Sequence, residues 1–203
     1  MLLWINGPFG GGKTQTAYEL RRRLPGSVVC DPEHIGFGLH RTLPEALRGD
    51  FQDLPAWRQG VYDVLDLALR RHHDGPVIVP MTLVEPAYFA EVVGRLRDAH
   101  GADRVRHFAL LAERERVLKR LSERGLGRGL KRESFAVRKL DGCLERLAGP
   151  EFADHIRTDE LTVPQVAERV AGLAGLPIAP NRDGRVRHRL RRMRVGLAHI
   201  RFD

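Results

Sequence analysis

The chain has 203 residues, of which 42% are hydrophobic and 30% charged, with a net charge of +8. This composition suits one α/β domain and excludes a disordered chain. No apolar run approaches the ~20 residues of a membrane span, and the N-terminus lacks a signal-peptide core. The two cysteines, Cys30 and Cys143, show no metal-binding spacing, so we expect a cytoplasmic protein with reduced thiols.

Short apolar runs alternate with helical patterns, which is typical of a parallel sheet covered by helices. Strands are predicted at 2–6, 27–31, 76–80, 105–111 and 155–159. Helices are predicted at 14–24, 57–69, 86–100, 113–124, 133–147 and 163–173. Five strands joined by right-handed crossovers predict a three-layer α/β/α domain with a five-stranded parallel sheet over residues 1–180.

A glycine-rich segment directly follows the first predicted strand. It reads Gly7-Pro8-Phe9-Gly10-Gly11-Gly12-Lys13-Thr14 and matches the phosphate-binding pattern G-x-x-x-x-G-K-[ST]. Backbone N–H groups of such a loop, together with the N-terminus of the next helix, bind phosphate oxygens. We therefore predict that these glycines, Lys13, Thr14 and Gln15 bind ATP. Thr14 would also hold Mg²⁺.

The third predicted strand lacks the acidic residue with which many P-loop NTPases hold magnesium. It runs from Val77 into Pro80-Met81-Thr82, and no acid follows until Glu85. This disfavours motor ATPases and GTPases and leaves small-molecule kinases. In such kinases an aspartate at the end of the second strand often receives the proton of the attacking hydroxyl or holds a water on Mg²⁺, roles that Asp31 could take. The alternative is that Asp31 only forms a turn before Pro32, since Asp-Pro commonly opens turns.

A glycine- and arginine-rich segment resembles a kinase lid at about residues 120–138. Arg120, Arg124 and Arg128 surround Gly125–Gly129, and such arginines neutralise a phosphoryl group during transfer. Arg124 is the preferred catalytic candidate, and Arg138 is a further one. The alternative is a solvated helix face followed by a flexible turn.

Residues between the second and third predicted strands are expected to cover the acceptor substrate. Aromatic and amide side chains there suit a nucleobase or a sugar. The candidates are Asp31, Phe37, Phe51, Gln52, Trp57, Arg58 and, from the third strand, Met81. Trp57 could equally belong to the core of an amphipathic helix.

Several of these segments together resemble the tunicamycin-resistance proteins of the TmrB type. The matching stretches include 4–7, 13–17, Asp31-Pro32-Glu33 with Gly36-Phe37, 50–52 with 57–58, Val79-Pro80-Met81-Thr82 and 199–201. The resemblance implies a P-loop, kinase-like ATP-binding protein that protects a bacterium from tunicamycin, a nucleoside antibiotic. It leaves open whether the drug is phosphorylated or only bound, and the lid arginines are inferred from chemistry instead.

The C-terminal residues 181–203 form a basic tail. They contain eight arginines and two aspartates and so carry +6 of the net charge, while residues 1–180 are nearly neutral. Apolar residues at helical spacing predict an amphipathic helix. It could dock on the domain or, as a peripheral contact over residues 182–203, on an anionic membrane surface. Nucleic acid is disfavoured because aromatic residues are not interleaved.

Overall fold

The computed structural model describes residues 1–122 and 130–184, and of residues 130–136 only the backbone. Five parallel strands form one sheet in the order β2-β3-β1-β4-β5. They are β1 (Leu2–Asn6), β2 (Val28–Val29), β3 (Val77–Pro80), β4 (Val105–Leu111) and β5 (His155–Arg157). The predicted fold class is confirmed. The edge strands β2 and β5 are shorter than predicted because each pairs with only one neighbour.

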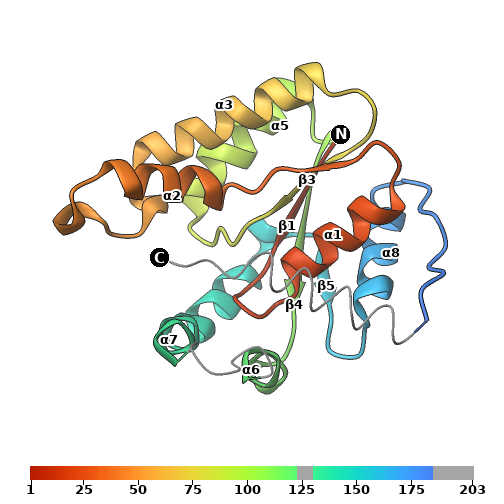
Figure 1. Ribbon diagram of the computed structural model, residues 1–203. Coiled ribbons are helices and arrows are strands. Elements are labelled where there is room, and N and C mark those ends of the chain that lie inside the picture. Colours follow the sequence, from red (N-terminus) through yellow and green to blue (C-terminus); the bar gives the residue numbers. More distant parts are fainter. Residues whose placement is uncertain (123–129, 185–203) are drawn as a thin grey trace.

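Helices cover both faces of the sheet (Figure 1). One core layer joins Leu3 and Ile5 of β1 to α1 (Lys13–Arg23) and α8 (Val163–Leu173). The other joins Leu2 and Trp4 to α3 (Pro55–Arg71), α5 (Arg95–His100) and α7 (Leu130–Leu147). Because successive strand residues point to opposite faces, the fully buried β1 supplies both layers. The carboxyl end of β1 is thus held rigidly at the centre of the sheet.

The remaining elements are short. They are α2 (Glu33–Thr42), η1 (Glu45–Leu47), η2 (Phe51–Asp53), α4 (Pro86–Phe89), the π-helical turn η3 (Ala90–Gly94), α6 (Arg114–Ser122) and η4 (Pro150–Phe152). Helix α2 was not predicted, because Gly36 and Gly38 weaken a helical pattern. Its start is stabilised by Asp31, whose Oδ1 accepts the N–H of Glu33 at 3.0 Å.

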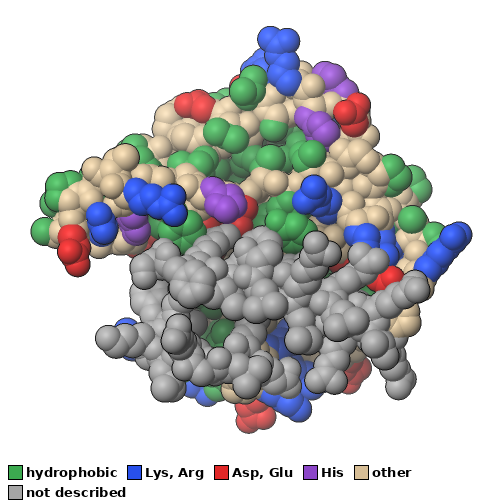
Figure 2. Space-filling view, in the orientation of Figure 1, with side chains coloured by type: hydrophobic (Ala, Val, Ile, Leu, Met, Phe, Trp, Pro, Cys, Tyr) green, Lys and Arg blue, Asp and Glu red, His purple; other side chains and the backbone are tan. Residues whose placement is uncertain are grey.

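Two predicted features lie partly outside the described residues. The glycine-rich centre of the lid, 123–129, and the basic tail from residue 185 onward are not described. Within 1–122 and 130–184, no helix is both long and apolar enough to cross a membrane. On the face seen in Figure 2, the basic side chains of the described residues are scattered among acidic and polar ones.

Candidate nucleotide and acceptor site

The glycine loop has a backbone shape that requires glycine. Gly10 has a φ of +79°, and a Cβ there would lie 2.9 Å from Cγ of Leu121 in α6. The N–H of Gly11 donates to the carbonyl of Pro8 at 2.9 Å, and Gly12, with a φ of +94°, leads into α1. The loop therefore turns tightly between β1 and the N-terminus of α1, where peptide N–H groups favour an anion. This geometry fits a bound phosphate chain.

Lys13 is held over this loop. Its Nζ donates to the carbonyl oxygens of Gly7 and Pro8, both at 3.0 Å, and lies 5.6 Å from the centroid of the Phe9 ring. These bonds fix the ammonium group beside the position that a phosphate in the loop would take. Thr14 and Gln15 follow in the first turn of α1, where the prediction placed the metal and further nucleotide contacts.

The fully buried Asn6 connects the loop to the neighbouring strands. Its Oδ1 accepts the N–H groups of Gly7, at 2.9 Å, and Leu83, at 3.0 Å. Its Nδ2 donates to the carbonyl of Leu83 at 2.7 Å and lies 3.1 Å from Nε2 of His107 on β4. Burial lowers the pKa of His107 to about 4, which keeps the ring neutral and able to accept this bond.

A hydrogen-bond chain leads from the loop toward the expected acceptor region. Thr82, just after β3, donates its hydroxyl to the carbonyl of Gly7 at 2.8 Å. Nε2 of Gln52 donates to the Thr82 carbonyl at 3.1 Å, and Arg58 donates to the Gln52 carbonyl at 2.6 Å. Arg58 is itself fixed by Glu91 at 2.7 Å. One hydrogen-bond network therefore connects the phosphate loop to the residues that were predicted to cover the acceptor.

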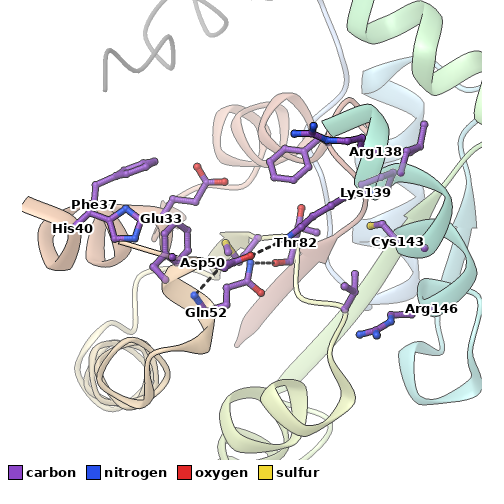
Figure 3. A pocket seen from close by; sticks show the side chains of 18 residues that line it. Glu33, Phe37, His40, Asp50, Gln52, Thr82, Arg138, Lys139, Cys143 and Arg146 are labelled. Atoms are coloured by element: carbon purple, nitrogen blue, oxygen red, sulfur yellow. Dashed lines mark hydrogen bonds and ion pairs between the residues drawn. The ribbon is translucent and has the colours of Figure 1, made fainter. Parts of the chain in front are cut away.

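A cavity of about 550 Å³ lies beside the phosphate loop (Figure 3). One wall comes from α2, η2 and Asp50, which precedes η2, and the opposite wall comes from α7. The phosphate loop and the segment after β3 lie between these walls. The principal lining side chains are Phe9, Glu33, Phe37, His40, Asp50, Phe51, Gln52, Met81, Thr82, Arg138, Lys139, Cys143 and Arg146. An aromatic wall thus faces a basic wall.

The predicted acceptor residues divide into two groups. Phe37, Phe51, Gln52 and Met81 line the cavity, whereas Asp31, Trp57 and Arg58 do not. Trp57 is buried in the core, its Nε1 donates to the carbonyl of Pro32 at 3.1 Å, and its ring centroid lies 5.5 Å from that of Phe51. Trp57 and Arg58 therefore support residues of the cavity wall from behind.

Other lining residues were missed from the sequence. Glu33 and His40 lie with Phe37 on one face of α2, at a spacing that would have revealed them if the helix had been predicted. Lys139 of α7 pairs with Asp50 across the cavity, N to O, at 3.0 Å. Arg146 pairs with Glu85, the first acid after β3. No local sequence signal links these partners, which the fold alone brings together.

Cys143 lies in the same wall of α7. Burial raises the pKa of its thiol to about 11, so the thiol is protonated at neutral pH. This fits the prediction of a reduced thiol in a packed position.

Of the predicted lid arginines, Arg120 and Arg138 are described, and Arg124 and Arg128 are not; Arg138 lines the cavity from α7. Arg120 donates to the hydroxyl of Thr158 at 3.1 Å and to its carbonyl at 2.6 Å, at the end of β5. Its neighbour Leu121 contacts the phosphate loop at Gly10. The segment predicted to be a lid therefore follows a helix that is anchored beside the loop.

Comparisons with known proteins agree with this geometry. A model of the AAA domain family matches residues 2–150. The tunicamycin resistance protein of Deinococcus radiodurans is similar at 36% identity over 89% of this chain and 99% of that one, with a TM-score of 0.73. Comparison with curated protein sequences gives no significant match.

More distant solved structures share the fold. Shikimate kinase from Bacteroides thetaiotaomicron has 16% identity, covers 87% of this chain and 99% of its own, and has a TM-score of 0.56. The APS kinase of Mycobacterium tuberculosis also has 16% identity, over 86% and 96%, with a TM-score of 0.57.

Proposed function

The chain belongs to the AAA domain family and is a homologue of a tunicamycin resistance protein, and from this we propose its function. We propose that it is an ATP-dependent phosphotransferase that acts on tunicamycin or a related nucleoside. The acceptor would be a hydroxyl group. The supporting observation is the cavity of about 550 Å³, which lies against the phosphate loop and carries both aromatic rings and carboxylates. A nucleoside bound there would have its hydroxyls near the γ-phosphate of ATP.

The loop amides and Lys13 would bind the β- and γ-phosphates, and the Thr14 hydroxyl would hold magnesium. Magnesium would neutralise charge on the phosphate oxygens during transfer. Arg124 and Arg128 would close over the phosphoryl group, and Arg120 would bind nucleotide from its place beside the loop. Transfer forms a bond between the acceptor oxygen and Pγ, breaks the bond from Pγ to the bridging oxygen, and releases ADP.

The proton of the acceptor hydroxyl needs a carboxylate, and two are close in sequence. We assign this role to Glu33, because it lines the cavity, and give Asp31 a positioning role, because its Oδ1 holds the N–H of Glu33. Glu33→Gln should lower kcat by about 10²–10⁴-fold while ATP affinity stays unchanged. Asp31→Asn keeps an oxygen for the same N–H and should remain active. Loss of turnover in Asp31→Asn alone would reverse the two roles.

The decisive experiment incubates the protein with Mg-ATP and tunicamycin and analyses the drug by mass spectrometry. We expect one added phosphoryl group, and none with Lys13→Ala, which removes the ammonium from the phosphate loop. Recovery of unmodified drug after incubation with active, ATP-binding protein would refute phosphotransfer.

One observation supports a second candidate, ATP-dependent binding of tunicamycin without chemistry. The first acid after β3, Glu85, is paired with Arg146 rather than placed at the phosphate loop, so the usual magnesium-orienting acid is missing there. In that case, equilibrium dialysis with ATP would show the drug retained by the protein, and mass spectrometry would show it unchanged.

A further inference from the structure

Helix α2 presents three side chains to the cavity. Glu33, Phe37 and His40 all line it, and their spacing of four and then three residues places them on one face of the helix. Figure 3 shows these residues together on one side of the cavity, across from Arg138, Lys139 and Arg146 of α7. The face of α2 is thus a wall of the proposed acceptor site.

His40 carries a polar atom that the protein leaves unsatisfied. Its Nε2 is buried and has no hydrogen-bond partner in the part of the chain that the structure describes. Buried polar atoms of this kind are rare because leaving one without a partner costs free energy. Because His40 lines the cavity, rotation of its ring toward the cavity would let a ligand supply the missing partner and recover this cost.

The His40 ring belongs to a small aromatic cluster with Phe51 and Phe37. The His40 ring lies edge-on to Phe51, with centroids 5.6 Å apart and an angle of 62°, and Phe37 lies edge-on to the same ring at 6.0 Å and 76°. Close approach of Phe51 to α2 requires Gly36, since a Cβ there would lie 2.5 Å from Cγ of Phe51. The flat rings of Phe37 and Phe51, with the polar His40 ring beside them, suit a planar ligand ring with polar edges.

We propose that Nε2 of His40 hydrogen-bonds to the edge of a heteroaromatic ring of the acceptor, such as a nucleobase, that lies against Phe37 and Phe51. This assignment rests on the proposed function and names the residue that reads the ring. A neutral imidazole offers Nε2 either as donor or as acceptor. It therefore recognises a ring carbonyl in one tautomer and a ring N–H in the other.

The test compares nucleosides with ribose, which lacks the ring. Uridine, cytidine, adenosine and ribose are titrated by calorimetry into protein saturated with a non-hydrolysable ATP analogue. At least one nucleoside should bind more tightly than ribose. His40→Phe, which keeps a ring against Phe51, should reduce this preference about tenfold, the cost of one lost hydrogen bond in a dry site. Affinity for the ATP analogue should not change.

A matched control comes from the same helix. His34 is exposed and does not line the cavity, so His34→Phe should leave the nucleoside preference unchanged. The His40→Phe variant should melt no lower than the wild type, since no satisfied hydrogen bond is removed. A clear fall in its Tm would show that Nε2 has a structural partner and would overturn the proposal.

The remaining outcomes separate this inference from the proposed function. Equal nucleoside preference in His40→Phe and wild type, or no preference over ribose in wild type, would overturn the ring-reading role. Unmodified tunicamycin together with a His40-dependent preference would refute phosphotransfer and leave the ring-reading role standing.

Discussion

Two glycines in α2 allow a controlled test of the cavity wall that α2 and Phe51 form. A Cβ on Gly36 would lie 2.5 to 2.7 Å from three ring carbons of Phe51, whereas a Cβ on Gly38 would have no atom within 4 Å. Both residues lie inside the same helix, so Gly→Ala has the same intrinsic benefit at each. The two variants therefore differ mainly in whether the Phe51 ring must move.

The magnitudes follow from this difference. Alanine in place of glycine inside a helix stabilises by about 1 kcal/mol, and Gly38→Ala should gain this amount. Gly36→Ala gains the same but must displace a packed ring, which costs typically about 1–3 kcal/mol. Gly36→Ala should therefore be less stable than Gly38→Ala by about 1–3 kcal/mol.

Urea unfolding measures these free energies directly. A thermal melt should place Gly38→Ala above the wild type and Gly36→Ala at or below it, at about 2–4 °C per kcal/mol for a chain of this size. Displacement of Phe51 should also weaken nucleoside binding in Gly36→Ala only. Equal shifts in both variants would show that α2 does not pack on Phe51 as described.

Three further predictions concern single side chains. Burial lowers the pKa of His107 from 6.5 to about 4, so its neutral form stabilises the fold above pH 6.5. About 3 kcal/mol of the free energy of unfolding is lost as the pH falls from 6.5 through 4. Urea unfolding across this range should show a weaker pH dependence in His107→Gln. Thr82→Val removes the hydroxyl that donates to the Gly7 carbonyl and should weaken ATP binding about fivefold, measured by calorimetry. Thr82→Ser keeps the hydroxyl and should bind ATP as the wild type does. Equal ATP affinities of Thr82→Val and the wild type would exclude a role of this hydrogen bond in shaping the loop. With its pKa raised to about 11, Cys143 should react with iodoacetamide at pH 8 about a hundredfold more slowly than an ordinary thiol. Peptide mapping that shows the reactivity of an ordinary thiol would contradict its burial.

Much of the fold was predictable because its signals are local. The apolar runs at β1, β3 and β4 and the glycine loop each lie within a short stretch of sequence, and each appears as predicted. Helix α2 was missed because its glycines and its start, which depends on the Asp31 carboxylate, hide the helical pattern. With it, Glu33 and His40 were missed as cavity residues.

The amino-acid sequence alone determined the shape of the proposed phosphate site. The loop, Lys13 and the N-terminus of α1 are contiguous, and their residue types set the backbone conformation. Only the tertiary structure decided which side chains form the walls of the cavity. Lys139 lies across the cavity from Asp50, and Thr82 of the segment after β3 reaches Gly7. Such partners are far apart in the chain, so no local pattern records them, and their meeting depends on how helices pack on a sheet.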